Sequence, residues 1–416
     1  MNRSIRLRLL PKLIVLLLVV AGMENCAIIF PVIAPFADLP QPNGPYAVAT
    51  RTATWTDSSR DETFTQEPDY RRIVVQVWYP VEKGSEQIPN LYIDDPGLRL
   101  PAIAKQLRLP VSMIKHIDGV RTHSYTEIST DASESKFPVI LFSHGLSGMR
   151  FQNTALMEEL ASQGYVVFAA DHSYAANITI FDNGDRAEYR AGKRRPLTAD
   201  MLKRVDLSQL SIVVDDLEFM LERIRDIKPD LFLKNIPYDQ NTIGVVGHSL
   251  GGAAILNAMA IDAHIQAAMV LDGWYIPLPD SVLLNGLDKP IFHLGQIQWS
   301  DPNNYQQMEI LLSNCSGPLY KVLVPGTSHT DFTDMPLFTS FSLLIGYTKI
   351  QDPLWLNELT RASTVKFFDV YLKGQASSEL IQWMNSAKKT SCYVFIPNES
   401  SSILNPGGKS DQLIQP

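Results

Sequence analysis

Short stretches with the alternating period of a β-strand and longer stretches with the period of an α-helix follow one another along the chain. Residues 71–80 (RRIVVQVWYP) alternate between polar and apolar positions and are rich in β-branched residues, which predicts an antiparallel edge strand. Buried strands are predicted where apolar runs are bounded by turn residues, at 138–145, 165–171, 242–247, 267–272, 290–295 and 320–326.

A helix is predicted at 153–163, between two of these strands, and a last helix is predicted at about 354–372, after all of them. A third helix, long and amphipathic, is expected from an N-cap at Thr198 to about residue 228. Strands and helices that alternate in this way predict an α/β fold with a mainly parallel sheet and helices on both faces. The polar residues after Gly374 are expected to form an appendage.

The first 37 residues have the features of a targeting segment. Four basic residues between positions 3 and 12 precede an unbroken apolar run at 13–21, which is shorter than the ~20 residues needed to span a bilayer. An export signal is the favoured interpretation, ahead of an uncleaved membrane anchor and of a buried helix. The sequence therefore predicts a leader at 1–37, a folded body at 38–374 outside the cytoplasm, and an appendage at 375–416.

The composition is that of a globular protein with a negative net charge. With 36 Lys and Arg against 44 Asp and Glu, the formal charge is −8, so no nucleic-acid partner is expected. The three cysteines are too few for a disulfide framework and include no CxxC pair for zinc. They allow one bridge, most plausibly Cys315 to Cys392, with free thiols as the alternative.

The sequence 247–251, GHSLG, matches the pattern G-x-S-x-G and lies between a predicted strand and a helix rich in small residues. A serine on a tight strand-to-helix turn needs glycine on both sides, because the strained backbone leaves no room for side chains there. An ordinary glycine-rich turn is the alternative. Ser249 is therefore the predicted nucleophile.

A serine nucleophile needs a histidine base and a carboxylate that orients it, in this architecture in the order Ser, Asp or Glu, His. His329 lies in a turn after a predicted strand and is the predicted base, whereas His293 lies inside an apolar run and is expected in the core. Asp272 ends a strand and is the predicted acid. Asp301, in the loop after the next strand, is the weaker candidate.

Two backbone amides are expected to bind the oxyanion of the tetrahedral intermediate. One is that of Leu250, directly after the nucleophile, and the other is that of Leu146, in the loop after strand 138–145. His144 is expected to brace this loop rather than to transfer protons.

At these residues the sequence resembles the group VIIA platelet-activating-factor acetylhydrolases, the plasma and type II intracellular lipoprotein-associated phospholipases A2. The resemblance runs from Gly44 to about Gly374. It includes WYP at 78–80, FSHGLSGMR at 142–150, GHSLGG at 247–252, LDGWYIPL at 271–278 and HTDF at 329–332. The resemblance implies an α/β-hydrolase fold, a triad of Ser249, Asp272 and His329, and oxyanion amides at Leu146 and Leu250.

Three stretches depart from the family pattern. Leu250 replaces Phe, Thr330-Asp331 replaces Gln-Asn, and residues 171–173 read Asp-His-Ser where the family has Glu-His-Arg. These changes leave the acyl and head-group preferences open. Trp274 and Phe332 are the predicted substrate contacts. For residues 274–278, an apolar rim that meets lipid and ordinary loop packing are left as equal alternatives.

The resemblance implies calcium-independent hydrolysis of short or oxidised sn-2 acyl chains of phospholipids, or of small esters, without a cofactor or metal. The alternative is a general carboxylesterase, cutinase-like or dienelactone-hydrolase-like, acting on non-phospholipid esters. A binding protein built on an inactive hydrolase fold requires a broken triad, and here all three residues are present. The GKS at 408–410 lacks the upstream glycine of a phosphate loop, so nucleotide binding is not expected.

Overall fold

The computed structural model describes residues 35–66, 68–84, 88–126, 136–190, 199–226, 231–386, 391–395 and 402–404. For 199–208 and for the segments after residue 390 it describes the course of the backbone alone. Nearly all of the predicted leader lies outside the described residues, as do Thr198 and the GKS sequence. Within the described ranges, no helix combines the length and the apolarity that crossing a membrane requires.

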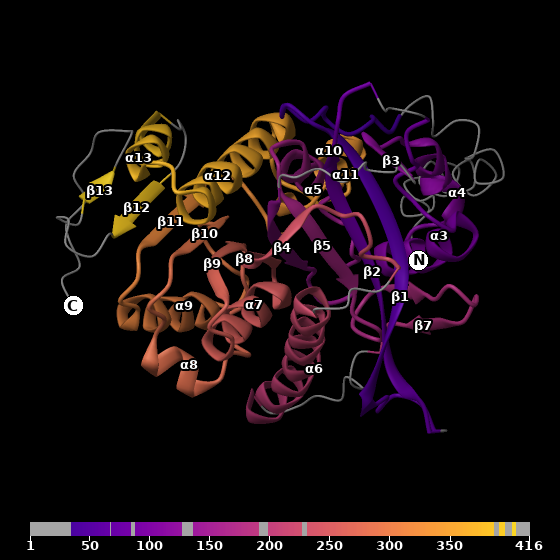
Figure 1. Cartoon of the computed structure of the whole chain (residues 1–416), viewed down its shortest axis with the longest axis horizontal. Helices are drawn as coiled ribbons and strands as arrows, with labels where there is room; N and C mark the ends of the chain where they lie inside the picture. Colours follow the sequence, from indigo (N-terminus) through magenta and orange to yellow (C-terminus); the bar gives the residue numbers. More distant parts are fainter. Residues whose placement is uncertain are drawn as a thin grey trace, which may run out of the picture.

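A mixed β-sheet runs through the centre of the molecule (Figure 1). Its strands stand in the spatial order β13-β12-β11-β10-β9-β8-β4-β5-β2-β1-β3. Their bounds are β1 Ala47–Asp61, β2 Tyr70–Val81, β3 Ser124–Thr126, β4 Phe137–Ser143, β5 Val166–Asp171, β8 Tyr238–His248, β9 Ile265–Leu271, β10 Ile291–Gln296, β11 Leu319–Val324, β12 Ser391–Phe395 and β13 Ser402–Leu404. The neighbouring strands from β5 across to β11 are parallel, and they are the buried apolar runs predicted above.

The prediction that 71–80 forms an edge strand is wrong in its position. The strand is antiparallel, but β2 pairs with β5 on one side and with β1 on the other, and β1 pairs with β3. Residues 47–61 alternate as well, and they form a strand long enough to cover β2 from Arg71 to Val81.

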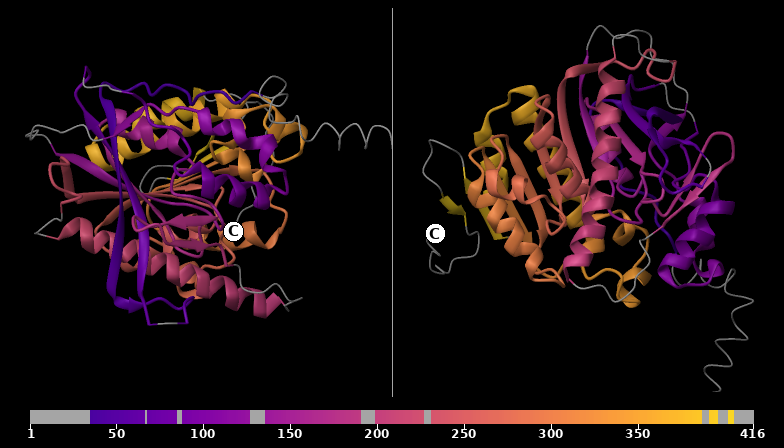
Figure 2. Two further views of the ribbon diagram at one scale, coloured as in Figure 1. Left: turned by 90° about the vertical axis from the view of Figure 1, so that its right-hand side faces the viewer. Right: turned by 90° about the horizontal axis from the view of Figure 1, so that it is seen from below.

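Alternate residues of the strands face two separate cores. Val139 and Leu141 of β4 pack with α6 (Ala199–Arg225), α7 (Leu250–Ile261), α8 (Asp280–Asn285) and α9 (Asn303–Asn314). Ile140 and Phe142 of the same strand pack with α5 (Thr154–Ser162) and α12 (Pro353–Lys373). Figures 1 and 2 show these two sets of helices on opposite faces of the sheet. The predicted arrangement, a mostly parallel sheet with helices on both faces, is confirmed.

The chain after Gly374 contacts the main sheet. Helix α13 (Ser377–Ser386) buries Leu380 and Met384 completely in the core that contains α12. Strand β12 pairs antiparallel with β11, and β13 pairs with β12. The division of the chain at residues 37 and 374 stays a prediction, and the described segments beyond 374 extend the sheet of the main body.

Candidate active site

Ser249 lies on a sharp turn between β8 and α7. β8 ends at His248 and α7 begins at Leu250, and Ser249 between them has φ 57° and ψ −120°. The flanking glycines are required by close approach, since a Cβ on Gly247 would stand 2.3 Å from the backbone oxygen of Gly251. A Cβ on Gly251 would stand 2.1 Å from the oxygen of Ser143. The turn therefore holds Ser249 in a strained backbone conformation at the carboxyl end of a parallel strand.

Asp272 and His329 form a hydrogen-bonded pair. Asp272 follows β9 directly, and His329 begins the 3₁₀ helix η3 (His329–Phe332) after β11. The Nδ1 of His329 lies 2.6 Å from Oδ2 of Asp272. Because a carboxylate only accepts, Nδ1 carries the proton, and Nε2 of the neutral ring is left as a proton acceptor.

The Asp272 carboxyl is fully buried and ionised. It accepts two further hydrogen bonds from Gln296, one from the backbone N at 3.0 Å and one from Nε2 at 2.8 Å. Burial raises the pKa of Asp272, but the hydrogen bonds from His329 and from the backbone amide of Gln296 outweigh burial, so the pKa lies below its ordinary value. Asp272 is therefore a charged partner for His329 at neutral pH.

Two aromatic rings enclose His329. The ring of His248 stacks on it at 4.6 Å and 25°, and the ring of Trp299 meets it edge-on at 4.7 Å. The Nε2 of His248 donates to the backbone oxygen of His329 at 3.1 Å, and its Nδ1 accepts from Nε2 of Gln152 at 3.1 Å. Burial, together with the nearby His329, lowers the pKa of His248 to about 3, so this ring stays neutral.

Ser249 and His329 open into one apolar cavity of about 300 Å³. Short helices on two sides supply its walls: α3 (Pro96–Leu107), α4 (Val111–Ile114) and η2 (Lys115–Gly119), and α10 (Met335–Phe338) and α11 (Phe341–Leu344). Aliphatic and aromatic side chains predominate, and the described lining includes no Asp, Glu, Lys or Arg. The cavity suits a neutral, apolar group beside Ser249.

The loop after β4 passes beside Ser249. Leu146 lines the cavity, and a Cβ on Gly145 would stand 2.9 Å from the Cβ of Ser249. Among the described residues, neither the backbone N–H of Leu146 nor that of Leu250 has a hydrogen-bond acceptor. Unpaired backbone donors beside a nucleophile are what an oxyanion hole requires.

His144 braces this loop, in agreement with the expectation from the sequence. Its Nδ1 donates to the oxygen of Gly145 at 2.7 Å, and its Nε2 accepts from the backbone N of His172 at 3.2 Å. Burial lowers the pKa of His144 to about 4, so the ring is neutral and its two nitrogens are both occupied.

A second Ser–His–Asp chain lies behind the loop. Ser143 Oγ is 3.1 Å from Nε2 of His172, whose Nδ1 is 3.1 Å from Oδ2 of Asp216. All three side chains are completely buried, and Asp216 is also paired with Arg71. Because these three side chains are buried, no substrate can reach them. The Ser143–His172–Asp216 arrangement therefore supports the loop and is not a catalytic site.

The remaining predicted residues lie away from the cavity. Trp274 is half-buried against the core that contains α7, and Phe332 is buried in the core that contains α12; neither lines the cavity, and their predicted substrate contact stays a prediction. His293 is fully buried and bonded to the Tyr275 hydroxyl at 2.8 Å, as expected of a core residue. Asp301 caps the backbone N of Asn303 at 3.0 Å.

Several residues that build the site were not singled out from the sequence. Gln296 and Gln152 hold Asp272 and His248, and the segment 96–119 supplies a cavity wall. The two glutamines belong to no sequence motif. The segment 96–119 does carry a signal, because its apolar residues, which include Leu100, Ile103 and Ile117, could have been used to predict a helix there.

No group of three or more His, Cys, Asp or Glu side chains in the described part of the chain is placed to hold a metal ion. Cys315 is a free, buried thiol. Cys392 lies in β12, where side chains are not described.

Comparison with known proteins finds acetylhydrolase and esterase relatives. The chain is 27% identical over 243 residues to a platelet-activating factor acetylhydrolase of Bos taurus, a match that covers 51% of each chain. It is 24% identical over 392 residues to a probable 1-alkyl-2-acetylglycerophosphocholine esterase of Arthroderma benhamiae, covering 85% of this chain and 92% of the relative. The match to the animal relatives thus spans about half of their length.

Among solved structures, the chain is similar to a ferulic acid esterase from Streptomyces cinnamoneus. The TM-score is 0.68 at 25% sequence identity, covering 83% of this chain and 95% of that chain. The model of the family "platelet-activating factor acetylhydrolase, isoform II" matches residues 33–390, which includes the nucleophile turn, the His–Asp pair and the cavity walls. On this match the chain belongs to the isoform II family of platelet-activating factor acetylhydrolases.

Proposed function

We propose that this chain is a serine carboxylic ester hydrolase with Ser249, His329 and Asp272 as its catalytic residues. The observation that carries the proposal is the shared cavity, which is lined both by Ser249 on its strained turn and by His329, the partner of Asp272. The acetylhydrolase and esterase relatives, and the esterase of similar fold, support the same reaction class.

In the proposed reaction, Oγ of Ser249 attacks the acyl carbonyl while Nε2 of His329 takes its proton. Asp272 keeps His329 in the required tautomer and stabilises the imidazolium. The developing oxyanion accepts hydrogen bonds from the amides of Leu146 and Leu250. His329 then gives its proton to the leaving alcohol, and a water molecule, deprotonated in the same way, releases the acid from the acyl-enzyme.

The proposed substrates carry a short or oxidised acyl chain, either at the sn-2 position of a phospholipid or in a small ester. The cavity of about 300 Å³ lies at the lower end of the range for small-molecule sites, and its apolar lining suits an acyl chain. The proposed steps use neither calcium nor another cofactor, so activity is expected to persist in excess EDTA.

A general carboxylesterase is the second candidate. The described lining of the cavity offers no charged side chain to a phosphate or a choline group, which favours neutral esters. The structurally similar ferulic acid esterase points to the same alternative. Phospholipids of graded sn-2 chain length, compared with p-nitrophenyl and feruloyl esters, distinguish the two by their kcat/KM values.

We further propose that the folded body acts outside the cytoplasm and contacts lipid surfaces peripherally. The basic and apolar residues at 3–21 support the location. Exposed apolar side chains near the cavity support the contact, since Leu344 is 80% exposed and Ile345, which lines the cavity, is 37% exposed.

The replacement Ser249→Ala tests the proposal. The variant is expected to fold and to lose hydrolysis of p-nitrophenyl acetate by at least about 10³-fold. A fluorophosphonate probe is expected to label Ser249 in the unaltered chain and nothing in the variant. Retained turnover in the variant, or absence of labelling in an unaltered chain that hydrolyses esters, would refute the assignment.

A further inference from the structure

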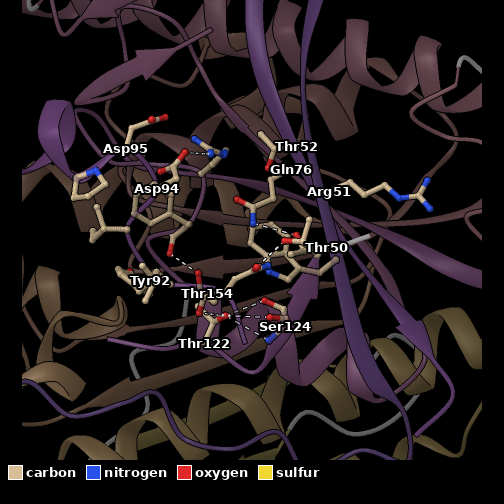
Figure 3. A pocket seen from close by; sticks show the side chains of 18 of the residues that line it. Thr50, Arg51, Thr52, Gln76, Tyr92, Asp94, Asp95, Thr122, Ser124 and Thr154 are labelled. Atoms are coloured by element: carbon tan, nitrogen blue, oxygen red, sulfur yellow. Dashed lines mark hydrogen bonds and ion pairs between the residues drawn. The ribbon is translucent and has the colours of Figure 1, made fainter. Parts of the chain in front are cut away.

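A larger cavity, of about 830 Å³, adjoins the cavity at Ser249, and Tyr92 and Ile93 line both of them. Several polar side chains of its lining bond to one another (Figure 3), such as Nε2 of Gln76 to Oγ1 of Thr50 at 3.1 Å. The lining includes none of the proposed catalytic residues. The larger cavity is therefore separate from the proposed reaction site, whereas a buried histidine of β10 lies close to the acid of that site.

This histidine, His293, is completely buried in the middle of β10. In the sheet it stands between Val270 of β9 and Lys321 of β11. Its Nδ1 is 2.8 Å from the hydroxyl oxygen of Tyr275, whereas its Nε2 has no hydrogen-bond partner among the described residues. A buried polar atom without a partner is unfavourable, so Nε2 calls for a polar group nearby.

The carboxylate of Asp272 is such a group. A Cβ on Gly295 would stand 2.6 Å from Nε2 of His293 and 2.8 Å from Oδ1 of Asp272. The two atoms thus border the same small space, which a side chain at position 295 would fill. Glycine at this position leaves the imidazole and the carboxylate open to each other.

Asp272 has one acceptor site left on Oδ1. A carboxylate has about four lone-pair sites. Oδ2 accepts from Nδ1 of His329 and from Nε2 of Gln296, and Oδ1 accepts from the backbone N of Gln296. The hydroxyl of Tyr305 also comes near Asp272, but its single proton is donated to the backbone oxygen of Gln296. The free site is therefore on the oxygen that His329 does not use.

The negative charge of Asp272 selects the tautomer of His293. If Nδ1 donated to Tyr275, the bare lone pair of Nε2 would face the carboxylate, and the Tyr275 proton would lack an acceptor among the described residues. With Tyr275 donating to Nδ1, Nε2 carries the proton and turns a positive end toward Oδ1. Burial lowers the pKa of His293 to about 4, so the ring is neutral near pH 7.

The cation nearest in the sheet does not compete for this role. Lys321 of β11, whose charge adds to the lowering of the His293 pKa, forms an ion pair with Glu309 of α9 at 2.9 Å. The described titratable groups around the ring are Asp272, Tyr275, Tyr305, Glu309 and Lys321. Of these, Asp272 is buried and borders Nε2, so its charge acts most directly on His293.

From this arrangement we propose that His293 is a positioning residue of the catalytic triad: its Nε2–H, fixed by Tyr275, stabilises the Asp272 carboxylate at the oxygen that His329 does not use. This role rests on the proposed function of the chain. A carboxylate stabilised at Oδ1 attracts the imidazolium of His329 less strongly at Oδ2. His293 thereby limits the basicity of His329 and restrains the rotation of the carboxylate.

The replacement His293→Phe tests this role, because it keeps an aromatic ring in the core and removes both nitrogens. The apparent pKa of the base, read from the pH dependence of kcat/KM on p-nitrophenyl acetate, is expected to rise by about 0.5 unit. On the plateau of the profile, kcat is expected to fall about threefold to tenfold with KM little changed. A residue that merely fills the core would lower stability and leave the pH profile in place.

Tyr275→Phe removes the hydroxyl that fixes the tautomer of His293, so a smaller upward shift is expected, whether or not His293→Phe folds. Combined with His293→Phe it is expected to add nothing, because the hydroxyl acts through His293. The matched control is Tyr165→Phe, which deletes a buried hydroxyl bonded to Asp369 at 2.7 Å in the core on the other face of the sheet, and the parent profile is expected. In a chain that hydrolyses the ester through Ser249, an unshifted profile in His293→Phe or in Tyr275→Phe overturns the inference and leaves the proposed function intact.

A ¹⁵N NMR spectrum of the histidine-labelled Ser249→Ala chain gives a readout that needs no turnover. The signals that disappear in His293→Phe belong to His293, and they are expected to show a proton on Nε2 and none on Nδ1. Asp272→Asn is expected to shift these signals, whereas Asp301→Asn leaves them in place. A proton on Nδ1, or no response to Asp272→Asn, refutes the interaction of His293 with Asp272 even if the chain hydrolyses no ester.

Discussion

Around His329, each neighbouring side chain restricts the ring to one tautomer and one orientation. The carboxylate of Asp272 accepts a hydrogen bond from Nδ1–H of His329, and the backbone oxygen of His329 accepts one from Nε2 of His248. Because the pKa of His248 is depressed to about 3, that ring does not compete for the serine proton near neutral pH. Proton transfer is thereby confined to Nε2 of His329.

Replacing Asp272 by Asn tests this confinement. The amide has nearly the same shape, but its NH₂ group can donate to Nδ1 and stabilise the wrong tautomer, so kcat is expected to fall by about 10³–10⁴-fold with folding retained. Asp301→Asn, at the acid rejected on strand position, is the matched control and is expected to keep its activity. Steady-state kinetics on p-nitrophenyl acetate compare the two, and equal losses would contradict the role of Asp272.

His248 is expected to act as a positioning residue. In the proposed site it contacts His329 but none of the reacting atoms. His248→Phe keeps the stack but loses the hydrogen bond to the His329 oxygen, whereas His248→Ala loses both. We expect kcat to fall about 10–100-fold in His248→Ala and less in His248→Phe, with KM little changed. The split between kcat and KM is the readout, because a general loss of structure would change both parameters. A rise in KM as large as the fall in kcat would contradict the positioning role.

The residues that belong to sequence motifs could be predicted from the sequence, whereas the residues that hold them in place could not. Ser249, Asp272 and His329 each stand at a strand end, a position that one-dimensional periodicity reveals, and the structure brings Asp272 and His329 into contact. Gln152 and Gln296 owe their place to contacts between segments 96 and 24 residues apart in the chain. A single sequence does not report such contacts, because glutamine is equally common on exposed surfaces.

Helix α5 carries a buried acid, Glu158, whose ionisation opposes folding. The side chain is fully buried, and burial raises its pKa to about 7 although Ser124, His123 and Thr122 donate hydrogen bonds that lower it. Burial likewise raises the pKa of Asp334, and Glu158 contributes to that rise. The two acids therefore stay protonated in the folded chain over a pH range in which they ionise in the unfolded chain.

We expect the free energy of unfolding to decrease as pH rises from about 4.5 to about 7, by about 3 kcal/mol from Glu158 alone. The folded state holds this proton up to about pH 7, while the unfolded state releases it near pH 4.5. In Glu158→Gln, the decrease of the free energy of unfolding with rising pH is expected to be smaller. Urea denaturation at pH 5 and at pH 7.5 measures this decrease. Glu159→Gln, which breaks the pair with Arg361 at 3.1 Å, is the control and is expected to lower stability while keeping the slope. Equal slopes in the parent and in Glu158→Gln would contradict this account.

The periodicity of apolar residues was enough to predict whether most segments form a helix or a strand. It did not predict where each strand lies in the sheet. β4, β5 and β8 to β11 were recognisable because strands buried on both faces read as continuous apolar runs. The position of β2 inside the sheet depends on its pairing with β1, a contact that the alternation of either strand does not determine.

At the scale of the molecule, the sheet brings distant segments to one edge. Ser249, Asp272 and His329 follow β8, β9 and β11, and the carboxyl ends of these parallel strands lie at the same edge. The two cavities meet at Tyr92 and Ile93, which lie in the segment between β2 and α3. Strand order alone thus gives the location of the proposed active site, but the cavity walls depend on helices inserted around the sheet.

The chain after Gly374 is expected to be part of the folding unit rather than a dispensable tail. Leu380 and Met384 of α13 are completely buried, and each contributes about 1.5–3 kcal/mol, so deleting both costs about 3–6 kcal/mol. Removing β12 also exposes the backbone edge of β11, which favours aggregation through edge pairing. A chain ending at residue 374 is therefore expected to melt at a lower temperature and to aggregate in light scattering, whereas a chain ending at Leu404 keeps α13, β12 and β13 and serves as the control. Identical melting temperatures for the two would show that the segment after 374 is an appendage after all.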